Sequence, residues 1–460
     1  MTVIKNILVE NLFFSFNYNI EFPEDQTTLI LTGPNGYGKT TILKIIEAAS
    51  KGNLLYFHFL PFSYIKIVYS DSLCFEIRKE ILDKEDANNL SAPDLITETD
   101  SHIDESISDS ISSFITSFSI HGGNGTSNFE IDDSKIHKAI QMSHPRYRSR
   151  YFRGMQLDTF STIDTKYALK HSEEIISYIF SNDPENSVFQ FYMQSLPNVY
   201  LVPAQRLHTK ANDKTTDARS ADDDIWIESI EDVSKKLREQ LKTSLSEYHD
   251  NSQKIDSLFI DNILYGDEEI DEIEYKAIEN QLKDKIDFLR KCNLIGEVKI
   301  PKYQKENSKI LNYYIRDLSK KLSSFDDLIS KLGLFFELIK TKGFTGKEVE
   351  VKLGNGLRIR NNMGAFIEIE NLSSGEKNEL IMLYHYIFGI SDGGILLVDE
   401  PEISLHVAWQ LPFVDELTKI AERKNFKVII ATHSPEIING KWNSCYDLFR
   451  EPQIENVANS

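Results

Sequence analysis

The stretch GPNGYGKTT at residues 33–41 decides the fold class. It follows the apolar run TTLILT and precedes a segment with helical apolar spacing, so it predicts a strand, a glycine-rich turn and a helix. The pattern G-x-x-x-x-G-K-[ST] in that context is typical of a loop that binds the phosphates of a nucleotide. A chance glycine-rich turn is the alternative, and the flanking elements disfavour it.

Each residue type in this loop has a physical reason. Glycines let successive backbone N–H groups point at one phosphate, and the N-terminus of the following helix adds its dipole. Lys39 supplies a positive charge for the β and γ phosphates, and the hydroxyl of Thr40 can bind Mg²⁺. We therefore expect ATP and Mg²⁺ as cofactors, with the phosphates held by Gly33, Pro34, Asn35, Gly36, Gly38, Lys39, Thr40 and Thr41.

Two acids follow a second apolar strand, in the segment ILLVDE at residues 395–400. An unpaired carboxylate is costly at the end of a buried strand, so Asp399 needs a cation, and Mg²⁺ at the phosphate loop would supply it. Glu400 is then placed to polarise a water for attack on the γ-phosphate. The alternative is that both acids only cap the turn at Pro401.

Two further polar residues follow apolar strands. His433 comes after FKVIIA, and a ring nitrogen there can contact the γ-phosphate, although a structural histidine is the alternative. Gln205 comes after NVYLV, and its amide can reach Mg²⁺ or the attacking water, although a surface position is the alternative. We expect Glu400, His433 and Gln205 to serve catalysis, and Thr40, Gln205 and Asp399 to bind the metal.

The segment NLSSGE at residues 371–376 opens a predicted helix. Ser373 or Ser374 can cap that helix with help from Glu376, which would be an ordinary capping arrangement. The segment also resembles the L-S-G-G-Q/E signature of ABC ATPases. Ser374 stands where that signature has the first of its two glycines.

The whole chain resembles the SMC-like and OLD-like ATPases of the AAA ATPase family. The matching motifs, in family order, are GPNGYGKTT, PAQR, LSSGEK, LLVDEPEISLH and ATHSPE, within residues 1–80, 196–210 and 347–445. The resemblance implies ATP binding between two copies of the chain, with Ser373, Ser374, Gly375 and Glu376 contacting the neighbour's nucleotide. Ser404-Leu405-His406 matches a loop that crosses the same interface. We therefore expect a head-to-tail dimer or a higher homo-oligomer.

The expected fold is α/β, an ABC-type nucleotide-binding domain with antiparallel strands and a phosphate-loop core sheet, interrupted by a helical arm. Residues 1–80 and 196–215 are assigned to its N-terminal lobe and residues 347–460 to its C-terminal lobe. Residues 81–195 form a polar and helical insertion, of which 81–135 is expected to be exposed and partly mobile. Residues 216–346 form a coiled-coil-like arm.

Composition limits the function classes. The 71 acidic and 51 basic residues give a formal net charge of −20, which disfavours a broad DNA-binding surface. The basic stretch 144–153 (HPRYRSRYFR) can still bind nucleic acid or an acidic protein, or be a solvated face. The three cysteines lack metal-binding spacing, and the chain lacks an apolar run of membrane-spanning length, so a cytoplasmic location without membrane contact is expected.

The resemblance extends to the stand-alone ATPase subunits of two-component anti-phage systems. In the PARIS type (AriA) the partner is a TOPRIM effector, and in the Septu type (PtuA) it is an HNH nuclease. Because residues 434–460 are too few for a nuclease domain, we expect a separate effector subunit. The basic stretch 144–153 would suit an acidic phage protein as trigger. The alternative is an SMC-like DNA-repair or chromosome-associated ATPase that acts directly on DNA.

Overall fold

The computed structural model describes residues 2–81, 114–122, 125–143, 162–181, 187–204, 230–266, 268–342, 344, 346–390, 392–403, 405 and 407–449. The chain divides into two compact units. Unit 1 comprises residues 1–204, 390–402 and 410–460, and unit 2 comprises residues 205–389 and 403–409. Both combine strands and helices, and the expected α/β class is confirmed.

Unit 1 contains an antiparallel sheet in which six described strands have the order β2-β1-β4-β5-β6-β7. Side chains alternate between the two faces of a strand, so Ile7 and Val9 of β1 lie on the same buried face. The strands are β1 (Ile4–Leu12), β2 (Phe16–Glu21), β4 (Tyr64–Tyr69), β5 (Cys74–Ile81), β6 (Phe114–Gly122) and β7 (Gly125–Asp132).

A second sheet of unit 1 is parallel throughout, with the order β14-β3-β13-β12-β8 among the described strands. Its members β3 and β12 are buried along their whole length, as expected for strands covered on both faces. The strands are β3 (Thr28–Thr32), β8 (Val199–Val202), β12 (Ile395–Asp399), β13 (Lys427–Ala431) and β14 (Cys445–Asp447). Four of these five are the apolar runs that the sequence marks as strands.

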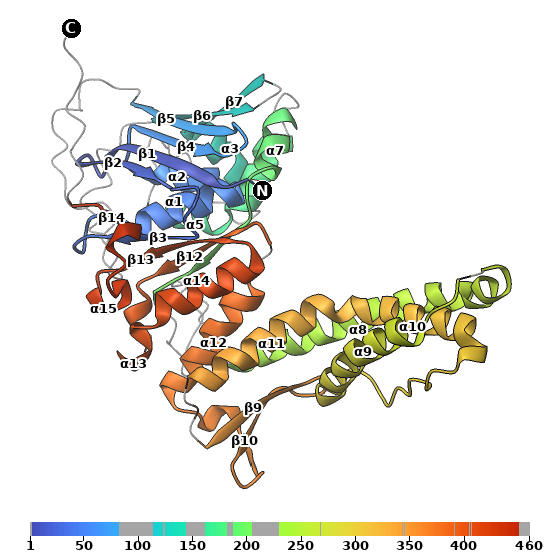
Figure 1. Cartoon of the computed structure of the whole chain (residues 1–460). Coiled ribbons are helices and arrows are strands. Elements are labelled where there is room, and N and C mark those ends of the chain that lie inside the picture. The colour runs from blue at the N-terminus through green and yellow to red at the C-terminus, as the bar shows by residue number, and fades with distance from the viewer. Residues whose placement is uncertain are drawn as a thin grey trace. The chain divides into compact units, whose positions relative to one another are not determined.

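Helix α1 (Lys39–Lys51) lies between the two sheets of unit 1 (Figure 1). Its apolar face, which includes Ile42 and Ile46, joins both sheets in one core. Helix α14 (Phe413–Lys424) packs against β13. The remaining helices of this unit are α2 (Leu54–Phe59), α3 (Asp133–Ser143), α5 (Thr162–Lys170), α6 (Ser172–Ser181), α7 (Ser187–Gln194) and α15 (Pro435–Ile438).

Part of the segment expected to be an exposed insertion belongs to the antiparallel sheet. Strand β6 pairs with β5 and β7, and Phe118 and Ile120 are fully buried. The serine-rich composition hides the alternation of these residues with Ser117 and Ser119, which gives β6 one apolar face. Residues 82–113 lie outside the described residues. Residues 54–59 form helix α2.

Unit 2 contains the arm and a small antiparallel sheet of order β11-β10-β9. The arm helices are α8 (Ile230–Tyr265), α9 (Glu272–Lys291), α10 (Ser308–Leu322) and α11 (Asp326–Thr341), within the range where the sequence predicts helices. The strands are β9 (Lys347–Lys352), β10 (Gly356–Asn361) and β11 (Phe366–Ile367), followed by α12 (Ser374–Phe388). Among the described residues, no helix has both the length and the apolar character of a bilayer-spanning segment.

Candidate nucleotide site

The glycine-rich turn joins β3 to α1 in unit 1. Gly36 and Gly38 have φ angles of 85° and 76°, in the left-handed region that favours glycine. A Cβ at Gly38 would also lie 3.2 Å from the Cδ2 atom of Leu12. This turn therefore depends on glycine both for its backbone conformation and for the space beside β1.

The side chain of Lys39 is only 5 % exposed. Its Nζ donates hydrogen bonds to the carbonyls of Gly33 (3.0 Å) and Pro34 (3.2 Å), and it lies 3.4 Å from Oε1 of Glu400. A buried ammonium needs such partners because desolvation is costly. These carbonyls belong to the glycine-rich turn itself. The ammonium group is therefore held next to the place where a phosphate bound by that turn would lie.

Thr40 and Asp399 meet at the ends of two elements, the start of α1 and the carboxyl end of β12. The Thr40 Oγ1 atom lies 3.0 Å from Oδ1 and 2.9 Å from Oδ2 of Asp399. Asp399 is 5 % exposed. A hydroxyl and a carboxylate are the hard oxygen ligands that Mg²⁺ prefers, so this pair fits a magnesium ion.

Glu400 follows β12 in an unusual backbone conformation. Its φ angle is 40°, although it is not a glycine, and its N–H donates a 2.9 Å hydrogen bond to the carbonyl of Ala431. A non-glycine residue at positive φ costs free energy on the order of 1 kcal/mol or more and is concentrated at functional sites. The conformation turns the Glu400 carboxylate toward Lys39 and His433.

His433 follows β13 and contacts two carboxylates with one ring atom. Its Nδ1 lies 2.5 Å from Oε2 of Glu400 and 3.2 Å from Oε1 of Glu402. The His433 side chain remains 49 % exposed. Because Nδ1 faces acceptors, it carries a hydrogen, which leaves Nε2 as the ring atom that can meet another group.

Glu402 is a site residue that the sequence reasoning missed. Its Oε1 accepts hydrogen bonds from the hydroxyl of Thr432 (2.6 Å) and from the backbone N–H of His433 (3.1 Å). Its Oε2 is buried and has no hydrogen-bond partner among the described residues. A signal was present, because Glu402 is a third acid within four residues after a buried strand.

The acids and the histidine also meet a geometric requirement for binding a cation. One ligand atom from each of Glu400, Glu402 and His433 lies within 4.8 Å of the others. Two carboxylates and an imidazole can coordinate a divalent transition metal. Nδ1 of His433 already contacts Oε2 of Glu400 and Oε1 of Glu402, and these contacts join the loops after β12 and β13.

The signature segment lies in unit 2, at the start of α12. Ser373 accepts a hydrogen bond from the N–H of Glu376, and Glu376 Oε2 accepts one from the N–H of Ser373 at 2.9 Å. This capping box confirms the predicted local structure. Lys347 of β9 reaches both Glu376 oxygens, at 2.7 and 2.8 Å. Partial burial alone would raise the pKa of Glu376, but the hydrogen bonds from Lys347 and Ser373 outweigh it and lower the pKa.

The structure thus brings Lys39, Thr40, Asp399, Glu400 and His433 together in unit 1, and it places the signature residues in unit 2. Other predicted residues lie outside the described part of the chain: Gln205, Ser404, His406 and the basic stretch 144–153.

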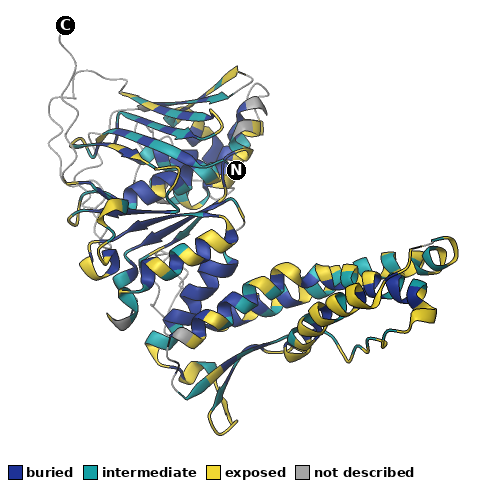
Figure 2. Ribbon diagram, viewed as in Figure 1, coloured by how far each residue is buried: buried dark blue, intermediate teal, exposed yellow. Residues whose placement is uncertain are grey.

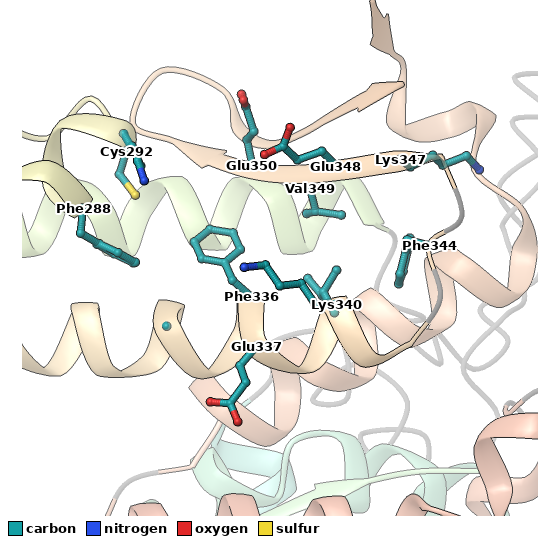
Figure 3. A pocket seen from close by; sticks show the side chains of 13 residues that line it. Phe288, Cys292, Phe336, Glu337, Lys340, Phe344, Lys347, Glu348, Val349 and Glu350 are labelled. Atoms are coloured by element: carbon teal, nitrogen blue, oxygen red, sulfur yellow. The ribbon is translucent and has the colours of Figure 1, made fainter. Parts of the chain in front are cut away.

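A cavity of about 760 Å³ lies in unit 2 between α9, α11 and β9. Phe288, Phe336 and Phe344 line it, with the amine of Lys340 beside Phe336 (Figure 3). Lys347, which holds Glu376, also contributes to the wall. None of the residues predicted to bind a nucleotide lines this cavity.

The model of one protein family, described as an AAA ATPase domain, matches residues 3–438. The chain belongs to this family. It is an ATPase, and the phosphate loop, Asp399 and Glu400 described above lie inside the matched range. No curated protein matches this ATPase at a significant level.

Solved structures similar to this ATPase include SMC head domains. One is the Smc head domain with an extended coiled coil bound to the C-terminal domain of ScpA, from Pyrococcus furiosus, with 14 % identity, coverage of 95 % of this chain and 91 % of that chain, and a TM-score of 0.30. Another is the SMC head domain from Thermotoga maritima, with 10 % identity, coverage of 96 % and 94 %, and a TM-score of 0.31. At such TM-scores the likeness supports no argument about function.

Proposed function

We propose that this ATPase hydrolyses Mg·ATP at a site that a second copy of the chain completes. The contact between Thr40 Oγ1 and the Asp399 carboxylate, at 2.9 and 3.0 Å, supports the magnesium part of the proposal most directly. It joins the phosphate loop to the acid after β12 through oxygen ligands suited to Mg²⁺. Bound magnesium would neutralise charge on the β and γ phosphates.

The residues around this pair have distinct roles in the proposal. Lys39 binds the phosphates, and Glu400 accepts a proton from the attacking water. His433, held at Nδ1 by two carboxylates, presents Nε2 to the γ-phosphate. Gln205 completes the set as a ligand of magnesium or of the water, on the strength of the family resemblance.

The second copy supplies its signature. Ser373 heads α12, whose first N–H groups and dipole suit an anion. In the proposal Ser373, Ser374, Gly375 and Glu376 of one copy contact the γ-phosphate bound by the other. Charge on the γ-phosphate is then neutralised from both sides. A single copy lacks the partner's signature at its own nucleotide, so it hydrolyses ATP slowly.

Complementation between two inactive variants tests the shared site. Lys39→Ala removes the phosphate-loop cation, and Ser373→Arg places a bulky cation at the head of α12. Each variant alone should be inactive, whereas a mixture should recover about a quarter of wild-type turnover, because half of the dimers are mixed and one of their two sites is intact. No recovery in a mixture shown to form hybrid assemblies would refute completion in trans and leave a site within one copy.

We also infer a biological role, that of sensor and scaffold in an anti-phage defence system. The assembled ATPase would hold a separate nuclease effector, of the PARIS type first and the Septu type next, and release it on contact with an acidic phage protein. The arm, whose longest described helix has 36 residues, supports this role over a long-armed chromosome-associated ATPase. Co-purification with the product of a neighbouring TOPRIM or HNH gene, and its release by a phage protein, would support it.

The runner-up function is an SMC-like ATPase acting directly on DNA, and one sequence feature favours it. The arginines at positions 146, 148 and 150 alternate with serine and aromatic residues. Salt-dependent binding of a DNA fragment, lost on replacing Arg146, Arg148 and Arg150 with alanine, would favour this function. Binding of an acidic protein but not DNA would favour the sensor.

A further inference from the structure

The distal half of α8 has an exposed apolar face. The residues of α8 that are buried, Ile230, Val233, Ser234, Leu237 and Leu241, all belong to its first third. Figure 2 shows exposed residues along the distal part of the arm. Four large apolar side chains near the end of the helix are 57 to 82 % exposed: Leu258, Ile260, Leu264 and Tyr265.

The opposite side of α8 makes the contacts with the rest of the arm. Tyr248 stacks on Phe325 with ring centroids 5.0 Å apart. Asn251 donates a 3.1 Å hydrogen bond to Ser324, and Asp256 pairs with Lys321 at 2.5 Å. At 100° per residue, Ile260, Leu264 and Tyr265 project from the side of the helix away from these contacts, and Leu258, seven residues after Asn251, lies at the edge of that side. We call Leu258, Ile260, Asp261, Leu264 and Tyr265 the distal α8 face.

The end of the arm is strongly acidic. Residues 255–275 contain eight Asp or Glu residues and no Lys, Arg or His. Three of the acids are paired, with Lys321, Lys276 and Arg316. Exposed acids for which no ion pair is found among the described residues are Asp261, Glu268, Glu269 and Asp271, the last of which caps α9. Lys302, Lys305 and Lys309, before and at the start of α10, do not offset the eight acids.

Hydrogen bonds hold this end of the arm in one conformation. The Tyr275 hydroxyl donates to the carbonyl of Pro301 at 2.7 Å, and the Tyr303 hydroxyl donates to that of Ile270 at 3.1 Å. The side-chain amide of Asn312 donates to the carbonyl of Glu268 at 3.2 Å. A face presented by an ordered support binds without the cost of ordering it.

We propose that the distal α8 face docks a cationic amphipathic helix of a partner protein. Ile260 and Leu264 are one helical turn apart, the spacing that a second helix needs for side-chain packing. Asp261 lies between the apolar residues, and Glu268 and Glu269 follow them, so the partner places Lys or Arg beside its apolar stripe. A second copy fits this face poorly, because two identical acidic faces repel each other.

A designed peptide tests the proposal with the full-length chain. The probe is a fluorescein-labelled 18-residue helix of Leu and Lys with the two residue types on opposite faces, and the control peptide has the same composition in scrambled order. Fluorescence anisotropy at about 0.15 M salt should show saturable binding of the probe and binding at least ten-fold weaker for the control. A probe that does not bind, or binds no better than the scrambled peptide, would overturn the proposal.

Variants of exposed residues locate the binding. Ile260→Ser with Leu264→Ser, and separately Asp261→Lys, should each weaken binding about ten-fold, the effect of losing about 1.4 kcal/mol. Matched controls are Met363→Ser, which removes an apolar side chain that is 94 % exposed, and Asp284→Lys on α9. Equal losses in the controls would show general attraction to an acidic protein and contradict the proposal. The proposal would also be contradicted if the chain associated with itself without nucleotide and Leu264→Ser abolished that association, because the occupant of the face would then be a second copy.

Discussion

The hydroxyl of Thr432 donates a 2.6 Å hydrogen bond to Oε1 of Glu402, and the same oxygen accepts the N–H of His433. Glu402 follows β12 and the other two residues follow β13, so one carboxylate joins the loops at the ends of two neighbouring parallel strands. Since Glu400 and His433 lie on these loops, Glu402 supports their 2.5 Å contact, together with the hydrogen bond of the Glu400 N–H to Ala431.

Replacing Glu402 should therefore slow catalysis more than it weakens ATP binding. We expect Glu402→Ala to lower kcat about ten-fold, corresponding to about 1.4 kcal/mol, with KM changed less than two-fold. Glu402→Gln keeps an oxygen acceptor and should lose less. Glu436→Ala, which alters an acid bonded to Ser434 on the same loop, is the matched control. Steady-state ATPase kinetics measure both constants, and a KM rise as large as the fall in kcat would contradict the positioning role.

A second prediction separates the metal ligand from the phosphate ligand. Asp399→Asn removes the charge that Thr40 contacts but leaves Lys39 in place, so it should still bind ATP without magnesium. Lys39→Ala should lose ATP binding with or without magnesium. Binding of a fluorescent ATP analogue, titrated with EDTA and then with excess Mg²⁺, distinguishes them. If Mg²⁺ raised the affinity of the Asp399→Asn variant for the ATP analogue as much as it does for the wild type, Asp399 would be excluded as a metal ligand.

The sequence predicted those parts of the site that depend on local chemistry. Glycines at Gly36 and Gly38 predict left-handed backbone conformations, and Ser373 with Glu376 predicts a capping box, because each signal lies within a few residues. The apolar runs before Lys39 and Asp399 likewise predict fully buried strands, and parallel pairing then brings their carboxyl ends together.

Other features depend on tertiary contacts and could not be derived in the same way. The φ angle of 40° at Glu400 is maintained by the hydrogen bond of its N–H to Ala431, on another strand. The role of Glu402 becomes visible only when Thr432 lies beside it. Apolar side chains alternate with serines in β6, but the many serines of the segment hide this pattern. The sequence alone therefore places Phe118 in an exposed segment, and the pairing of β6 with β5 shows that it belongs to a sheet.

A third prediction concerns the pH dependence of stability. Burial lowers the pKa of Lys79 to about 7, although Asp133 opposes the shift, and the ordinary value is 10.5. Between those values the unfolded chain holds a proton that the folded chain has released, so this group makes stability rise with pH above 7. Below pH 7 the lysine is charged in both states, and the full cost of its burial remains.

Urea unfolding at pH 7.0 and 8.5 measures this effect. Lys79 should contribute a rise in the free energy of unfolding of about 1 kcal/mol per pH unit. Lys79→Met should reduce the slope by that amount, and Lys138→Met, at an exposed position of α3, should preserve it. Identical slopes in the wild type and Lys79→Met would show that Lys79 stays charged in the folded chain, held by the carbonyls of His58 and Leu60.

The fourth prediction concerns the support of the signature helix. Lys347 donates to both oxygens of Glu376, and both side chains are less than one quarter exposed. Lys347→Met removes charge-assisted hydrogen bonds and should lower the free energy of unfolding by about 1 to 2 kcal/mol at pH 7. Lys352→Met removes a more distant 3.7 Å pair with Glu350 and one hydrogen bond to the carbonyl of Lys291, so it should cost less than losing two hydrogen bonds to a carboxylate.

The low-pH behaviour of this cap follows from the lowered pKa of Glu376. The stabilisation is fully present above the ordinary glutamate pKa of 4.5 and is lost as the pH falls through the lower folded value, because the unfolded chain takes up the proton first. The difference between wild type and Lys347→Met, measured by urea unfolding from pH 7 to pH 3, should therefore shrink below about pH 4.5. A difference that stays constant to pH 3 would mean that Lys347 stabilises α12 by packing rather than through the Glu376 carboxylate.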